Sequence, residues 1–126
     1  MRGRPKLFRD SLELFFNPPA AETPVSDDVC DWMINAALKS PVMAMLELFR
    51  TVSETDFRED MKAFTMPTLL IHGSVDPFAP PPVTVLRVHK LIASSQLKMY
   101  EGASHGLFFT HQDRLNQDIT AFIADK

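Results

Sequence analysis

The sequence has a single cysteine, few glycines and no apolar run long enough to cross a bilayer. Because Cys30 has no partner in the chain, an intrachain disulfide is excluded, and we interpret this residue as a small, buried apolar side chain. The basic N-terminal residues are not followed by an apolar stretch, so we expect no secretory signal and a cytoplasmic protein. We expect no contact with a membrane.

The sequence also lacks an excess of positive charge. It has 13 lysines and arginines against 16 aspartates and glutamates, giving a net charge of −3. Phosphate binding needs a clustered positive field, so we expect no nucleic-acid partner. We interpret the short basic cluster at the N-terminus as a solvated end of the chain: Arg2, Arg4, Lys6 and Arg9. With 126 residues and 45% hydrophobic residues, the chain is long enough for one globular domain.

Glycine is scarce, and this limits the loop motifs that the chain can form. The four glycines are Gly3, Gly73, Gly102 and Gly106. No glycine-rich run precedes a Lys-Ser or Lys-Thr pair, so a phosphate-binding loop is excluded, and we expect no cofactor. A G-x-S-x-G pattern can occur once, at residues 102–106, with Ser104 at its centre.

The first half of the sequence, residues 1–64, reads as helices. A helix over Leu7 to Phe16 should end at Asn17-Pro18-Pro19, and a second should start after Ser26 as N-cap. Ser40 should cap a third helix, with Pro41 as its first residue. We expect the methionines of this half to pack in the core. Apolar residues recur at helical spacing in the second and third helices: Val29, Met33, Ala36 and Ala37, then Val42, Met45, Leu46 and Phe49.

The second half, residues 65–126, reads as strand, helix, strand and helix. Pro67 to Gly73 is a short apolar run typical of a strand buried on both faces, residues 81–93 form a helical pattern, and Gln96 to Tyr100 is a second strand. Thr110 should cap the last helix. Its expected inner face is Leu115, Ile119, Phe122 and Ile123. This order predicts two adjacent parallel strands joined by a right-handed crossover. Two strands leave both sheet edges open, so the pattern indicates the end of a larger sheet.

Two polar residues follow the expected strand ends. Asp76 comes just after the first strand, and His105 comes just after the second. Side chains at the carboxyl ends of neighbouring parallel strands can meet, because such strands lie about 4.8 Å apart. A carboxylate that orients an imidazole is the acid–base part of a hydrolytic triad. On spacing alone, an Asp turn residue and a loop histidine with no catalytic role are equally good interpretations.

Several segments together resemble the C-terminal part of α/β-hydrolases, in the branch of the cofactor-free (non-heme) chloroperoxidases and related esterases. They are Thr55 to Arg58, Pro67 to Gly73 with Asp76 and Pro80, Glu101 to Leu107, Thr110-His111, Leu115 to Asp118, and Phe122. Val25-Ser26, Trp32 and Ala37 to Pro41 resemble the helical cap of the same branch. The resemblance implies an α/β fold, with a cap-like segment over residues 1–64 and a β-α-β-α part over 65–126. It implies Asp76 as the triad acid and His105 as the base. Ser74 stands where many relatives have a second aspartate.

Ser104 offers an alternative nucleophile, because residues 102–106 match the pattern of a nucleophile elbow. In this fold the triad order is serine, acid, histidine. The one histidine after Ser104, other than His105, is His111, which precedes Asp118 and Asp125. We therefore interpret Ser104 as part of the loop that carries the base. His105, His111 and Asp113 match no zinc signature, and His72 and His89 read as structural residues, so we predict no metal site.

The resemblance implies a serine hydrolase that acts on a small acyl ester, or transfers the acyl group to peroxide, with His105 activating the serine. The first strands, the oxyanion loop and the nucleophile elbow belong to the N-terminal part of this fold and are not found in these 126 residues. Expected partners are a small-molecule substrate and either a complementary N-terminal half or a second copy. The alternative is a catalytically inactive remnant, or a binding or dimerising module.

Overall fold

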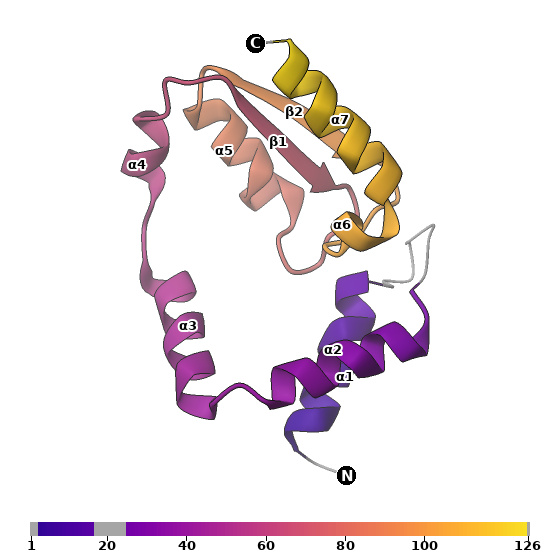
Figure 1. Ribbon diagram of the computed structural model, residues 1–126. Helices are drawn as coiled ribbons and strands as arrows, with labels where there is room; N and C mark the ends of the chain where they lie inside the picture. Colours follow the sequence, from indigo (N-terminus) through magenta and orange to yellow (C-terminus); the bar gives the residue numbers. More distant parts are fainter. Residues whose placement is uncertain (1–2, 17–24, 126) are drawn as a thin grey trace.

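The computed structural model describes residues 3–16 and 25–125 (Figure 1). Its elements are the helices α1 (Arg4–Phe16), α2 (Asp27–Leu38), α3 (Val42–Glu54) and α4 (Arg58–Lys62), followed by strand β1 (Thr68–Gly73), the 3-10 helix η1 (Pro81–Val83), helix α5 (Val85–Leu91), strand β2 (Ser95–Tyr100) and helices α6 (Leu107–Thr110) and α7 (Gln112–Ala124). The predicted order of helices, then strand, helix, strand and helix, is confirmed. Arg2 and the segment Asn17-Pro18-Pro19, where the first helix was expected to end, lie outside the described residues.

Strands β1 and β2 are parallel neighbours, as predicted, and pair without a bulge. Thr68 lies opposite Ser95 and Gly73 lies opposite Tyr100, so both strands end at the same level. Helices α5 and α7 flank the sheet (Figure 1). Lys98 and Tyr100 lie two residues apart on β2, so their side chains point to the same face of the sheet. Both donate hydrogen bonds to Asp118 of α7, which places α7 over that face. The buried cluster beside the strand ends is Tyr100, Ala103 and Leu107, with Ile71 and Leu115 packed against it.

The strands are less buried than predicted. The residues of β1 from Thr68 to His72 are half-buried, and Gly73 is the one buried residue of the strand. The reason is the open sheet edge, since within the described residues β1 pairs with β2 alone. On α7, Ile119 and Ile123 were expected to face inward, but they are 40% and 67% exposed.

Helix α1 packs against α2, and the C-terminal end of α1 reaches the loop before α6 (Figure 1). Arg9 of α1 pairs with Asp31 of α2, and the guanidinium of Arg4 donates to the carbonyl of Ser40 at 2.9 Å. Buried residues of this pair are Phe16, Cys30 and Ile34. Burial raises the pKa of the Cys30 thiol, in agreement with the interpretation of this residue as a buried apolar side chain.

Four details of the predicted helices are wrong. Helix α1 begins at Arg4 rather than Leu7, and α3 begins at Val42, with Pro41 as its N-cap instead of its first residue. The helix expected over 81–93 is divided into η1 and α5, because consecutive prolines lack the N–H groups that an α-helix needs. Thr110 does not cap α7, since its hydroxyl contacts Nδ1 of His111 at 2.7 Å.

The apolar face of α3 is also not packed as predicted. Within the described residues it is largely exposed: Val42 is 45% exposed, Leu46 54% and Phe49 64%, and Met43 beside it is 65% exposed. Met45 is the one residue of α3 that is half-buried. The prediction that all the methionines pack in the core is therefore wrong for Met43.

Candidate active site

The candidate site begins where β1 and β2 end side by side. The two loops that follow are joined by main-chain bonds: Ser74 N–H donates to the carbonyl of Tyr100 at 2.9 Å, and Val75 N–H donates to that of Ala103 at 3.1 Å. The hydroxyl of Ser74 accepts the N–H of Gly102 at 3.0 Å. An aspartate at position 74 could accept the same bond, which explains why serine is compatible with this position.

A tight turn holds the carboxylate of Asp76. Its Oδ1 accepts the N–H groups of Phe78 and Ala79, both at 2.9 Å, which is the turn that aspartate favours. Thr84 closes the same loop, with its hydroxyl 2.9 Å from the carbonyl oxygens of both Ala79 and Pro80. Asp76 is 5% exposed, so its negative charge is largely removed from water. The two N–H groups replace hydrogen bonds that the buried carboxylate would otherwise make with water.

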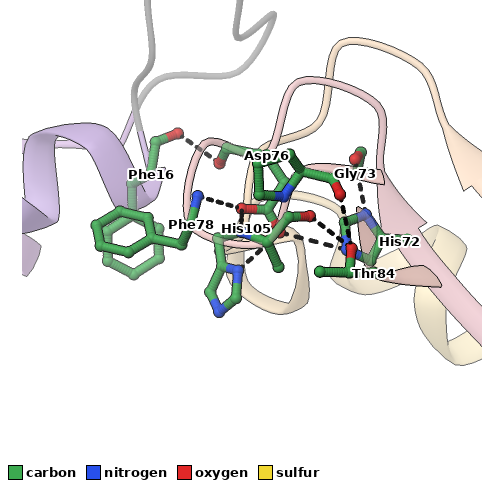
Figure 2. A network of polar contacts seen from close by, with 10 residues as sticks. Phe16, His72, Gly73, Asp76, Phe78, Thr84 and His105 are labelled. Carbon is green, nitrogen blue, oxygen red and sulfur yellow. Dashed lines mark hydrogen bonds and ion pairs between the residues drawn. The ribbon is translucent and has the colours of Figure 1, made fainter. Parts of the chain in front are cut away.

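His105 meets this carboxylate. Its Nδ1 lies 2.7 Å from Oδ2 of Asp76, which confirms the predicted proximity of the two side chains (Figure 2). An ionised carboxylate only accepts hydrogen bonds, so Nδ1 carries the proton and Nε2 keeps its lone pair. The His105 side chain is 38% exposed, and no described residue bonds to Nε2. The arrangement is that of an oriented general base.

A second imidazole lies beside Asp76. Nε2 of His72 is 3.5 Å from Oδ2 of Asp76, while Nδ1 contacts the carbonyl of Gly73 at 2.9 Å (Figure 2). Sequence reasoning identified His72 as a structural, hydrogen-bonded residue and missed its approach to the acid. The position of the two residues, four apart at a strand end, gave no direct signal of this contact.

Aromatic rings surround His105. The Phe15 ring centroid lies 4.7 Å from that of His105, and the Phe78 centroid lies 5.8 Å away. Phe15 comes from α1, and no motif in the sequence connected it with the histidine loop. Beside the pair is a cavity of about 280 Å³. Its lining is mainly apolar: Ile71, His72, Gly73, Asp76, His105, Leu107, Phe108 and Leu115.

Ser104 is not arranged as a nucleophile. It is 1% exposed, and its hydroxyl donates to the carbonyl of Phe16 at 2.9 Å. A nucleophile elbow places its serine on a strained turn with the hydroxyl exposed. Here, no described residue other than glycine has a positive φ, and the loop turns at Gly102 with φ 70°. Ser104 therefore matches the elbow pattern in sequence and not in structure.

The remaining histidines lie apart from the pair. His111 contacts Thr110, and Nδ1 of His89 lies 2.7 Å from the hydroxyl of Ser95. Among residues 3–16 and 25–125, no group of three His, Cys, Asp or Glu side chains could hold a metal ion. No described helix is long and apolar enough to cross a membrane.

Known proteins share this arrangement of elements. A bromoperoxidase from Bacillus anthracis superposes on 98% of the chain with a TM-score of 0.88 and 26% identity, and 45% of that structure is covered. A non-heme haloperoxidase from Rhodococcus erythropolis is 32% identical over 108 residues, which are 86% of this chain and 39% of the relative. The chain has part of the α/β-hydrolase fold.

Within the α/β-hydrolases, the similarity lies in the non-heme chloroperoxidase and esterase branch. A bifunctional esterase/perhydrolase from Acinetobacter calcoaceticus is 30% identical over 108 residues, covering 86% of this chain and 38% of the relative. No protein-family model matches the sequence. The chain spans well under half of the length of the curated relatives that it matches, 39% in the Rhodococcus protein and 38% in the Acinetobacter protein. It therefore represents part of the α/β-hydrolase fold.

Proposed function

We propose that Asp76 and His105 are the acid and base of a serine-hydrolase triad that cleaves small acyl esters. The observation that carries the proposal is the 2.7 Å contact between Nδ1 of His105 and the buried carboxylate of Asp76, which leaves Nε2 without a described partner. Residues 1–64 would then act as a helical cap above a C-terminal core part, residues 65–126. The nucleophilic serine would come from a polypeptide segment outside these 126 residues, either linked to them or bound as a partner.

In this reaction Nε2 of His105 takes the proton of the serine hydroxyl as the oxygen attacks the ester carbonyl. Asp76 stabilises the imidazolium that forms. His105 then gives the proton to the departing alcohol. Water attacks the acyl-enzyme with His105 again as base, and the carboxylic acid and free serine are released. Hydrogen peroxide in place of water would give a peracid, and the name of the Acinetobacter relative supports this second outcome.

The test is a fusion of this chain to the nucleophile-bearing N-terminal part of the Rhodococcus haloperoxidase. We expect the fusion to hydrolyse p-nitrophenyl acetate, and His105→Ala to abolish the rate. Asp76→Asn should lower kcat by up to about 10⁴-fold, because an amide can hold the imidazole in the wrong tautomer. The unfused chain should show no rate above its own His105→Ala variant, because the nucleophile and the oxyanion loop lie outside these residues. The control is the variant and not buffer, because an imidazole alone cleaves activated esters slowly.

Three results would contradict this proposal. A hydrolysis rate of the fusion protein that does not depend on His105 would show that His105 is not the base. Hydrolysis by the unfused chain that Ser104→Ala abolishes, with the fold intact, would identify Ser104 as the nucleophile. If the fusion folds and is inactive, the chain is a catalytically inactive remnant or a binding module, and the acid–base pair has no covalent reaction to assist.

A further inference from the structure

The C-terminal end of α1 contacts the loop on both sides of His105. The hydroxyl of Ser104 donates to the carbonyl of Phe16 at 2.9 Å, and the N–H of Gly106 donates to the carbonyl of Phe15 at 2.9 Å (Figure 2 shows the bond to Phe16). The two donors come from the residues immediately before and after His105. The main chain that carries the base is therefore tied at two points to a helix that lies almost ninety positions earlier in the sequence.

These bonds satisfy groups that a helix cannot satisfy alone. The last carbonyls of an α-helix have no intrahelical partner and are often capped by the N–H groups that follow a C-terminal glycine. The residues after α1 are Asn17 and Pro18, and proline has no N–H to donate. Among the described residues, the donors that reach the carbonyls of Phe15 and Phe16 come from the histidine loop.

The packing at this contact has no spare space. Phe16 is 0% exposed and Ser104 is 1% exposed. A Cβ atom at Gly106 would overlap the ring of Phe16, so the close approach of helix and loop requires glycine there. The Phe15 ring stands edge-on to His105, with an interplanar angle of 62°. Helix α1 thus fixes the main chain of the loop through its carbonyls. It restricts the orientation of the His105 imidazole through the Phe15 ring.

We propose that the end of α1 is a clamp that orients His105, with Ser104 and Phe15 as positioning residues. The clamp consists of the carbonyls of Phe15 and Phe16, the Phe15 ring, and their partners Ser104 and Gly106. The importance of the clamp for catalysis rests on the proposed function, because His105 acts as the base in that proposed reaction. The orientation of the imidazole is a separate property that can be measured without turnover.

The test is NMR spectroscopy of the 126-residue chain, reading the Nδ1 proton of His105 and its ring 1H and 15N shifts. We expect Ser104→Ala to remove the downfield Nδ1–H resonance or to make it exchange with water, because the loop is released from Phe16. Ser104→Cys adds no heavy atom and keeps a weak S–H donor, so it should retain more of the resonance than Ser104→Ala. The matched control is Ser94→Ala, which also removes a hydroxyl bond to a main-chain carbonyl, that of Met66 at 2.6 Å, and should leave the His105 signals unchanged.

A second variant covers the case in which Ser104→Ala does not fold. Phe15→Leu keeps the carbonyl and the apolar contact but removes the aromatic ring, so the His105 ring protons should lose their ring-current shift. Unchanged His105 signals in a folded Ser104→Ala, or in Phe15→Leu, would overturn the clamp. In the active fusion, the clamp predicts that Ser104→Ala lowers kcat with KM unchanged. An inactive fusion would contradict the proposed function and leave the NMR result to decide the clamp.

Discussion

Gly73 shows how closely the two loops of the site approach at the scale of single residues. It is the last residue of β1 and is buried. A Cβ atom at this position would overlap the carbonyl oxygen of Ala103 and lie 2.6 Å from that of Ser104. Both obstacles are main-chain atoms, which cannot rotate away as a side chain would. The glycine therefore allows the loop of His105 to cross the end of the strand that leads to Asp76.

From this contact we predict that Gly73→Ala destabilises the fold by about 1–3 kcal/mol, the usual cost of overpacking a tight site. The control is Gly3→Ala, where the nearest atom to a new Cβ is Cδ of Pro5, at 3.7 Å. Urea unfolding followed by circular dichroism measures both variants. Equal midpoints for Gly73→Ala and the wild type would show that the loops can move apart at little cost.

The proximity of Asp76 and His105 could be predicted from strand positions, and the resemblance to α/β-hydrolases implied their roles, whereas the residues around them could not be predicted. Asp76 and His105 each follow a strand end, and the parallel register brings both ends to one level. That reasoning needs only local patterns and one rule of topology. Phe15, in contrast, reaches His105 from the end of a helix, and neither hydrophobic periodicity nor a motif connects the two positions. Such contacts depend on how helix and sheet pack together.

At the scale of elements, Asp118 connects α7 to β2. Its carboxylate accepts the ammonium of Lys98 at 2.5 Å and the hydroxyl of Tyr100 at 2.6 Å, and Arg114 lies over the Tyr100 ring. The hydrogen bond from Lys98, followed by that from Tyr100, lowers the pKa of Asp118. Periodicity predicted α7 and placed Leu115 and Phe122 correctly on its inner face, but it was wrong for Ile119 and Ile123, because polar contacts as well as apolar ones hold the helix on the sheet.

This lowered pKa predicts a dependence of stability on acid. A carboxyl group whose pKa is lower in the folded state stabilises the fold above its unfolded pKa of about 3.9, and this contribution is lost as the pH falls further through the folded value. We expect Asp118→Asn to cost about 1.5 kcal/mol at neutral pH, towards the lower end for charged hydrogen bonds because Lys98 is partly exposed. Below about pH 4 the difference from the wild type should shrink.

The control for this prediction is Asp56→Asn. The bond from Arg58 lowers the pKa of Asp56 to about 2, but this pair is fully exposed and joins residues two apart. Exposed pairs contribute little to stability, so Asp56→Asn should unfold like the wild type across the acid range. Urea unfolding between pH 2 and pH 7 measures all three proteins. An acid profile of Asp118→Asn that is parallel to that of the wild type would contradict the assigned role.

At the scale of the whole molecule, α3 connects the helix pair α1–α2 to the sheet part while packing little itself (Figure 1). Its sequence has the apolar spacing of a packed helix, yet Leu46 is 54% exposed and Leu48 64%. A helix of 13 residues is marginal in water without a packed face. The sequence predicted the apolar face correctly and the burial wrongly, because periodicity shows which side of a helix is apolar and not whether another element covers it.

The exposed face of α3 predicts how the 126-residue chain behaves in solution. Contiguous apolar surface on a folded protein binds apolar dyes and promotes association. We expect the chain to enhance the fluorescence of anilinonaphthalene sulfonate and to scatter more light as its concentration rises. Phe49→Glu, which places a charge at the centre of this face, should reduce both signals. Thr51→Glu adds the same charge to an exposed polar position of the same helix and should leave both signals near those of the wild type.

If the two variants behave alike, net charge and not the apolar face controls association. If Phe49→Glu has no effect, other apolar surface must bind the dye, and the open edges of the two-stranded sheet become the next positions to substitute.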